Sequence, residues 1–261
     1  MIAAAKNDWR YGVPLLALCG IALLLLTGKN IALFVFLNTH LSVLGDTFWS
    51  HATVLGDTTI ALLLIMPLLV RKPQWSMQFL FAAVFATLYA HGMKELFSSL
   101  RPPAVLSTEQ FHLIGFALQN NSFPSGHTTT IFLLAGWFAM AVLSGWARVS
   151  IVAIALLVGL SRIACGVHWP LDVLGGIAGG WLCALAGISL ANHWTAFSAN
   201  RYTPKVLLIG GIVLAIWSIG WYDNTYAGTH ALQTFISVIS AALLITQIPR
   251  LFFANTSGSQ P

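Results

Sequence analysis

Three short stretches of this chain carry residues that could handle a charged substrate. The longest is 161–172, which reads Ser-Arg-Ile-Ala-Cys-Gly-Val-His-Trp-Pro-Leu-Asp. His168 and Asp172 are four residues apart, so on a helix they would share one face. A histidine backed by a carboxylate, with Arg162 close by, could act on a phosphate group. A helix-end ion pair at a membrane surface is the alternative interpretation of the same residues.

The second stretch, 94–102, contains two cations and ends in proline. Lys94 and Arg101 are seven residues apart, two helical turns, so both side chains can point in one direction. Pro102 and Pro103 would end that helix. The pair could bind an anion, or it could be two cations that reach toward the membrane surface from a helix end.

The third stretch, 121–127, reads Asn-Ser-Phe-Pro-Ser-Gly-His and forms the turn before an apolar segment. Ser125 is a good N-cap, and Gly126 would let a ligand approach the backbone closely. The free N–H groups and the positive end of the helix dipole favour an anion there. Capping alone would explain the serine and the glycine. It would not explain His127, which could pass a proton.

Taken together, the three stretches indicate phosphate chemistry. Lys94, Arg101 and Arg162, with the amides of a helix terminus, suit a phosphate dianion and the charge on its equatorial oxygens. Two histidines allow one nucleophile and one general acid. The residue types alone do not decide which histidine attacks. The carboxylate at i+4 favours His168 over His127.

These motifs resemble those of the type 2 phosphatidic acid phosphatases, whose signature is K-x6-R-P, then P-S-G-H, then S-R-x5-H-x3-D. Every position of the signature is matched here, with the family's spacing inside each motif. The matching residues are Lys94, Arg101 and Pro102, then 124–127, then Ser161, Arg162, His168 and Asp172. The resemblance covers about the third to sixth expected membrane spans. It implies a metal-independent phosphatase without a cofactor.

The resemblance also implies a role for each residue. His168 would attack phosphorus and become phosphorylated, and Asp172 would orient its ring and stabilise the imidazolium. His127 would protonate the leaving oxygen and then activate water for the second step. Five residues would hold the phosphate: Lys94, Arg101, Ser125, Gly126 and Arg162.

Composition indicates where such a site would lie. Of the 261 residues 57% are hydrophobic and only 7% are charged, whereas a soluble domain carries roughly 25% charged residues. We therefore expect an all-α, polytopic membrane protein. The chain has no obvious linker or repeat, so we expect one domain over 1–254, with the motif core at about 77–190, and a C-terminal tail at 255–261.

The apolar segments predict about eight membrane-spanning helices around a six-helix phosphatase core. The first span could continue past Lys29, because a bilayer needs about 20 residues, and 40–57 is predicted to be a loop. The family's usual core has six spans, so the last two helices look like an addition. The expected spans are 13–26, 58–70, 77–98, 128–143, 149–160, 173–190, 206–221 and 232–248.

The distribution of basic residues predicts the orientation of these spans. With a cytoplasmic N-terminus and eight spans, eight of the 12 lysines and arginines fall on the inner side, as the positive-inside rule requires. The three motifs then fall on the outer face, which would be the periplasmic face of a cell inner membrane. The eight inner residues are Lys6, Arg10, Arg71, Lys72, Arg148, Arg201, Lys205 and Arg250; the four outer ones are Lys29, Lys94, Arg101 and Arg162.

Several other features bear on partners. The basic residues at the inner side explain the net charge of +5 better than a nucleic-acid partner does. The few carboxylates and the three cysteines show no metal-binding cluster or spacing. The glycines at 175, 176, 179 and 180 allow close helix packing, either inside the chain or in a dimer, so the oligomeric state stays open. The apolar segment 111–118 is either a lid at the membrane interface or a packed loop.

The sequence therefore predicts a lipid phosphatase whose substrate keeps its tails among the membrane lipids. The candidate substrates are a prenyl diphosphate, phosphatidylglycerophosphate, phosphatidate or a lipid A phosphate. A phosphotransferase that moves the group from His168 to a second lipid, such as lipid A, needs the same phosphoenzyme and stays an alternative. A non-enzymatic binding or transport protein is a third possibility, against which the complete motif set argues.

Overall fold

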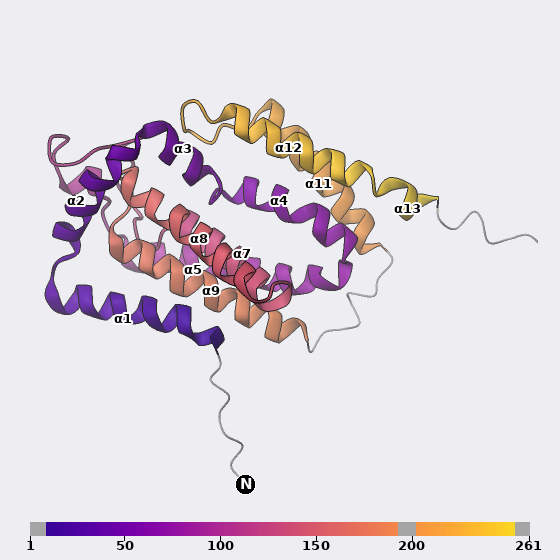
Figure 1. Ribbon diagram of the computed structural model, residues 1–261, viewed down its shortest axis with the longest axis horizontal. Coiled ribbons are helices and arrows are strands. Elements are labelled where there is room, and N and C mark those ends of the chain that lie inside the picture. The colour runs from indigo at the N-terminus through magenta and orange to yellow at the C-terminus, as the bar shows by residue number, and fades with distance from the viewer. Residues whose placement is uncertain (1–8, 193–201, 254–261) are drawn as a thin grey trace, which may run out of the picture.

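Every regular element in the computed structural model is a helix over the residues it describes, 9–192 and 202–253 (Figure 1). The expected all-α class is confirmed. In these ranges five helices are long and apolar enough to cross a membrane, or six if one bent pair counts as a single span. They are Trp9–Thr27, Trp146–Ala164, Pro170–Ala191, Thr203–Gly220 and His230–Phe252. The count of eight spans stays a prediction.

The end of the first helix, which the sequence did not decide, lies at Thr27. Helix α1 (Gly12–Thr27) stops at Gly28, whose φ of 65° is left-handed and whose N–H bonds the carbonyl of Leu24. Such a glycine cap terminates a helix. Lys29 then precedes a new helix, α2 (Asn30–Leu41). The expectation that the first helix could run past Lys29 is therefore wrong.

The segment 40–57, predicted to be a loop, is largely helical. A 3-10 turn at Ser42–Leu44 leads into α3 (Asp46–Val54), which is bent by 105° from the preceding pair of elements. Gly45 and the polar residues suggested a loop. However, Trp49 is buried in a cluster with Ala164 of the core, and Thr53 is buried too. Tertiary packing thus overrides the local turn signals here.

Two helices lead from this segment toward the first motif. Helix α4 (Thr58–Arg71) is capped by Asp57, whose Oδ1 accepts the N–H groups of Thr59 and Ile60 at 2.9 and 3.2 Å. Helix α5 (Ser76–Phe97) follows and ends at Ser98, which has a positive φ of 40°. A short helix α6 (Pro102–Val105) opens the long connection that the sequence predicts up to Pro124.

The centre of the molecule consists of α7 (Gly126–Ala141), α8 (Trp146–Ala164) and α9 (Pro170–Ala191), with α9 packed on both α5 and α7. Glycines make this packing possible. A Cβ added at Gly180 would lie 2.3 Å from the carbonyl oxygen of Thr129. One added at Gly179 would lie 2.0 Å from the ring of Tyr89. These glycines serve contacts inside the chain, as the first of the two interpretations predicts.

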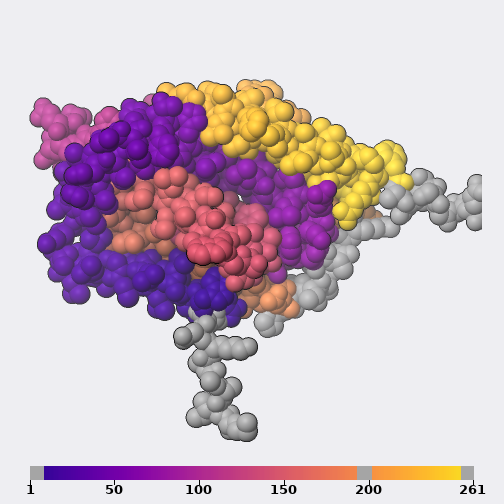
Figure 2. Space-filling model, in the orientation of Figure 1, coloured from indigo at the N-terminus to yellow at the C-terminus, as the bar shows by residue number. Residues whose placement is uncertain are grey.

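The C-terminal helices α11 (Thr203–Gly220) and α12 (His230–Ile245) pack against α4, and the short α13 (Ile248–Phe252) follows them. Figure 2 shows the yellow C-terminal helices lying directly against the purple segment that holds α3 and α4. The α11–α12 loop reaches the same end of the molecule as α2 and α3 (Figure 1). The expected tail, 255–261, and the basic residues Lys6 and Arg201 lie outside the described residues.

Candidate active site

The three motifs meet at one end of the helix bundle, because four helix termini converge there. Lys94 lies in the last turn of α5, and Gly126 and His127 begin α7. Arg162 lies in the last turn of α8, and Asp172 in the first turn of α9. The chain reverses between these helices, so residues that are distant in sequence come to share one polar region.

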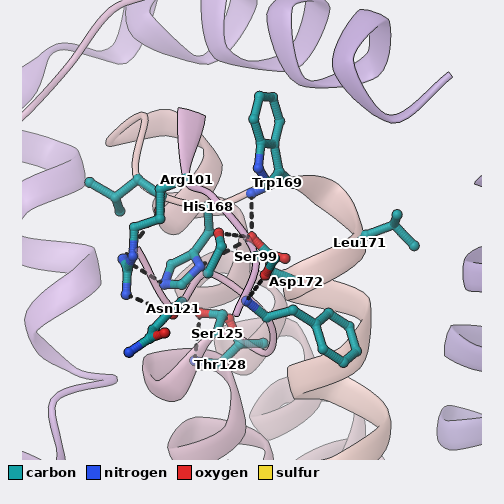
Figure 3. Close-up of polar contacts among 12 residues, drawn as sticks. Ser99, Arg101, Asn121, Ser125, Thr128, His168, Trp169, Leu171 and Asp172 are labelled. Carbon is teal, nitrogen blue, oxygen red and sulfur yellow. Dashed lines mark hydrogen bonds and ion pairs between the residues drawn. The ribbon is translucent and has the colours of Figure 1, made fainter. Parts of the chain in front are cut away.

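His168 and Asp172 form a buried pair in which each has 2% of its surface exposed (Figure 3). The His168 Nδ1 lies 3.3 Å from Asp172 Oδ2. The same carboxylate oxygen accepts the backbone N–H of Trp169 at 2.8 Å and the hydroxyl of Ser122 at 2.5 Å. A carboxylate with these donors fixes the ring so that Nδ1 carries the proton and Nε2 presents its lone pair. Ser122 was not predicted as a site residue.

Arg101 lies on the opposite side of the imidazole, with its Nη1 3.2 Å from His168 Nε2 (Figure 3). The guanidinium is buried and is anchored by backbone carbonyls. Its Nε donates to the carbonyl of Asn120 at 2.8 Å, and its Nη2 to that of Asn121 at 3.3 Å. The imidazole therefore lies between a carboxylate and a fixed cation.

The first turn of α7 adds the features of an anion site. Ser125 caps the helix: its Oγ accepts hydrogen bonds from the hydroxyl and the N–H of Thr128 at 2.9 and 3.4 Å. Its own N–H donates to the carbonyl of Asp172 at 3.0 Å. A Cβ added at Gly126 would lie 3.8 Å from the ammonium of Lys94. The lysine thus lies over a helix N-terminus, where a negative charge is stabilised.

Arg162 is buried, with 3% of its surface exposed. Its Nη1 donates to the hydroxyl of Thr53 on α3 and, at 2.7 Å, to the hydroxyl of Tyr226 in the α11–α12 loop. Its Nε has no hydrogen-bond partner among the described residues. Neither Thr53 nor Tyr226 was predicted as a site residue, because nothing in the local pattern links them to Arg162.

The electrostatics of the site favour a neutral His168 surrounded by cations. Burial, followed by the charges of Arg101, Arg162 and Lys94, lowers the pKa of His168 well below its usual 6.5, and His127 adds to the effect. Burial and the charge of Arg162 lower the pKa of Arg101 to about 10. At neutral pH His168 is therefore uncharged and Arg101 is charged. Both histidines and all three predicted cations lie close enough to interact.

A groove leads away from this cluster along the helices. Its volume is about 230 Å³, and it lies between α4, α5 and α7, with Lys94 and Gly126 at one end. On α5 the groove runs from Lys94 back to Phe79, over which the helix rises about 22 Å. Apart from His91 and the two residues at its end, the lining is apolar or threonine: Thr58, Ala61, Leu62, Phe79, Ala83, Ala86, Thr87, Ala90, Thr129, Thr130, Leu133 and Leu134.

The apolar loop 111–118 was predicted to be either a lid at the membrane interface or a packed loop, and it has features of both. Phe111 and Ile114 are buried in the core clusters, and the Ile114 N–H donates to the carbonyl of Cys165 at 3.0 Å. Phe116 and Leu118 are exposed, at 65% and 50%. The first half of the loop is packed, and the second half presents apolar surface. In 9–192 and 202–253, no three His, Cys, Asp or Glu side chains converge so as to hold a metal ion.

Comparison with known proteins agrees with this site. The family model "PAP2 superfamily" matches residues 75–196. The lipid A 1-phosphatase of Rhizobium etli is 36% identical over 121 residues, which are 45% of this chain and 51% of that protein. The Escherichia coli protein YbjG, named provisionally as an undecaprenyl-diphosphatase, is 40% identical over 86 residues, 32% of this chain and 40% of that protein. This chain thus spans about half the length, or less, of these curated relatives.

A solved structure extends the likeness to the fold. The crystal structure of Aquifex aeolicus LpxE superposes with a TM-score of 0.55 at 30% sequence identity, covering 61% of this chain and 94% of that one. The near-complete coverage of that structure, the family match and the complete motifs at one end of the helix bundle all indicate the same family. The chain belongs to the PAP2 superfamily of phosphatases.

Proposed function

We propose that this protein is a lipid phosphatase that hydrolyses a phosphate or diphosphate group of a membrane lipid through a phosphohistidine on His168. The observation that carries the proposal is the placement of this ring. Its Nδ1 is 3.3 Å from the Asp172 carboxylate, and its Nε2 faces the Arg101 guanidinium at 3.2 Å. A nucleophile oriented by a third group, with cations at the developing charge, is the arrangement that phosphoryl transfer requires.

In the first step, the lone pair of His168 Nε2 attacks phosphorus and the bond from phosphorus to the lipid oxygen breaks. His127 in its protonated form gives a proton to that leaving oxygen and becomes neutral, so the lipid departs as an alcohol or a monophosphate. Asp172 stabilises the positive charge that forms on the imidazole. The phosphate oxygens take over the contact that Arg101 now makes with Nε2 and are bound further by Lys94, Ser125, Gly126 and Arg162.

In the second step, His127 takes a proton from water as the water oxygen attacks phosphorus. The bond from phosphorus to Nε2 breaks, inorganic phosphate leaves and His168 returns to its neutral form. The chemistry is supplied by side chains alone, so we propose that it needs no metal ion. The low pKa of His168 helps at both stages, since it keeps the nucleophile unprotonated and makes the ring a good leaving group.

The groove between α4, α5 and α7 supports a lipid as substrate. Its cationic end lies at the proposed phosphate site, and its alanine, leucine and phenylalanine lining suits a hydrocarbon chain. A phosphate held at Lys94 and Gly126 would direct the chain of the same molecule along this groove. The names of the relatives point to a lipid A phosphate or a prenyl diphosphate as the first candidates.

The orientation proposed here follows from charge. A single domain over 1–254 with eight spans would place Arg71, Lys72 and Arg148 inside and the site outside, on the periplasmic face of the inner membrane. Lys94, Arg101 and Arg162 are three of the four outer exceptions to the positive-inside distribution, and the proposed function accounts for these three because each would bind phosphate.

A panel assay tests the proposal. Purified protein in detergent with EDTA would be given lipid A, prenyl diphosphates, phosphatidate and phosphatidylglycerophosphate, with His168→Ala beside the wild type. We expect release of phosphate that survives EDTA and is lost in the variant. Label that moves only between two lipids supplied together would make the protein a phosphotransferase. If no lipid releases phosphate and no lipid pair exchanges label, both activities are contradicted.

A further inference from the structure

The guanidinium of Arg162 is held by two residues that lie outside the segment matched by the superfamily, 75–196. Its Nη1 donates to the hydroxyl of Thr53 and to that of Tyr226, the latter at 2.7 Å. An arginine Nη carries two hydrogens, so these two hydroxyls use both of them. The partners come from α3 on one side and from the α11–α12 loop on the other.

This engagement leaves the other edge of the guanidinium for a ligand. The Nε of Arg162 is buried and has no hydrogen-bond partner among the described residues. A buried donor without a partner costs free energy, and the planar fork of arginine matches two oxygens of a phosphate. The two hydroxyls engage Nη1, so the edge that contains Nε is left without a partner among the described residues.

The ring of Tyr226 restrains Arg162 as well. The Arg162 Cζ lies 5.7 Å from the ring centroid, within the range of a cation–π contact. Tyr226 is only 8% exposed, and a Cβ added at Gly115 would lie 3.2 Å from its ring. The tyrosine is therefore packed in place against the long loop of the site, and a shift of its hydroxyl would displace the arginine.

The α11–α12 loop is built to hold Tyr226 in this position. Asn224 Oδ1 accepts the Tyr226 N–H at 2.9 Å and the Thr229 hydroxyl at 2.8 Å, and Asn224 Nδ2 donates to Gln233 Oε1 at 2.7 Å. Gln233 Nε2 in turn donates to the carbonyl of Tyr222 at 2.8 Å. A satisfied, buried polar network of this kind fixes one conformation. Two helices that served only to cross a membrane would not need it.

We propose that Tyr226 is a positioning residue of the phosphate site and that the α11–α12 hairpin carries it there. This inference rests on the proposed function, since the anion bound by Arg162 is taken to be the phosphate of the substrate. Tyr226 acts through Arg162: its hydroxyl and ring fix the guanidinium so that the Nε edge meets the phosphate oxygens without reorganisation.

The substitution Tyr226→Phe tests the hydroxyl while keeping the ring. We expect the dissociation constant for inorganic phosphate, from a ³¹P NMR titration of the full-length protein in detergent, to rise on the order of tenfold. With a lipid substrate KM should rise more than kcat falls. Tyr222→Phe is the matched control, because Tyr222 lies in the same loop and its hydroxyl donates to Asp57 at 2.5 Å, away from Arg162. It should lower Tm and leave phosphate binding unchanged.

A double-mutant cycle separates positioning from general destabilisation. If Tyr226 acts through Arg162, Tyr226→Phe should add little to the loss caused by Arg162→Lys, which has no fork to position. Thr53→Val is a second, independent variant, since it removes the other acceptor of Nη1 and should weaken phosphate binding in the same way. It keeps the test decisive should Tyr226→Phe fail to fold.

The outcomes distinguish this inference from the proposed function. Phosphate binding that is unchanged in both Tyr226→Phe and Thr53→Val, or losses that add fully to those of Arg162→Lys, would overturn the inference while the activity stands. A protein that hydrolyses no lipid phosphate, yet binds inorganic phosphate more weakly in these two variants, would refute the function and keep the role of Tyr226. A wild type that neither binds inorganic phosphate nor hydrolyses any lipid phosphate would overturn both.

Discussion

At the residue scale, the chemistry depends on the two groups that hold the ring of His168. Asp172 on one side fixes the tautomer, and Arg101 on the other lies where the phosphate oxygens would be. Ser122 in turn donates to the carboxylate. The proposed nucleophile is thus part of a connected set of hydrogen bonds that joins all three sequence motifs, and a change in any member should act through the ring.

Asp172→Asn should reduce kcat on the order of 10³- to 10⁴-fold, because an amide no longer selects the ring tautomer and cannot stabilise the imidazolium. Binding of inorganic phosphate should change little, since Asp172 does not face the anion. The comparison is Ser122→Ala, which keeps the carboxylate and removes one donor, and which should cost far less. Steady-state kinetics beside a phosphate titration measures both. Equal losses in the two variants would contradict this account of the ring.

The pKa of His168 predicts how stability responds to acid. The folded state holds this pKa well below 6.5, whereas the unfolded chain binds a proton near 6.5. Below that pH the unfolded state binds more protons, so stability falls by about 1.4 kcal/mol per pH unit until the folded pKa is reached. Thermal unfolding at pH 7.5 and 5.5 should show a larger loss for the wild type than for His168→Asn. Equal losses would mean that His168 titrates normally.

At the element scale, α9 positions Asp172 because glycines let it pack tightly on α7. Gly180→Ala should destabilise the fold by about 1–3 kcal/mol, since the new Cβ would lie 2.3 Å from the Thr129 carbonyl. Gly210→Ala on α11 is the matched control: nothing lies within 4 Å, and alanine favours a helix by about 1 kcal/mol. Thermal unfolding in detergent should shift in opposite directions for the two variants, and a shared direction would contradict the packing argument.

The groove between α4, α5 and α7 gives a second prediction at this scale. Ala83→Phe would fill the groove and should lower kcat/KM for a long-chain lipid phosphate roughly 10-fold or more, with little effect on a short-chain soluble substrate. Val84→Phe changes the neighbouring residue on α5, which is 45% exposed and does not line the groove. It should affect neither substrate. If Ala83→Phe lowers both rates equally, the groove does not hold the chain.

The elements could be predicted from sequence where their signals are local. The expected spans at 58–70 and 173–190 closely match α4 and α9, because long apolar runs with caps define them. The helix α3 was missed, since its stability comes from burial of Trp49 and Thr53 and not from its own polar, glycine-flanked sequence. The exact end of the first helix depended on the left-handed φ of Gly28, which no periodicity reveals.

At the scale of the whole molecule, the site joins a superfamily core to segments that the family match does not include. The motifs predicted every residue proposed for the chemistry, because their spacing within each stretch is local. Thr53 and Tyr226 could not be predicted, since they lie 109 and 64 residues from Arg162 and only the folded chain brings them to it. The two additional helices thereby connect to the proposed phosphate site, whereas no purpose for them could be predicted from the sequence.

The most direct test of the central claim is to trap the phosphoenzyme. Wild-type protein would be mixed with a ³²P-labelled lipid phosphate, quenched in alkali within milliseconds to seconds and mapped by proteolysis, with His168→Ala and His127→Ala treated alike. We predict a label that is stable to alkali, labile to acid and located on the peptide containing His168. His168→Ala should carry no label, and His127→Ala should retain what label it acquires, since water is no longer activated. Label at another residue, or turnover that persists in His168→Ala, would contradict the account.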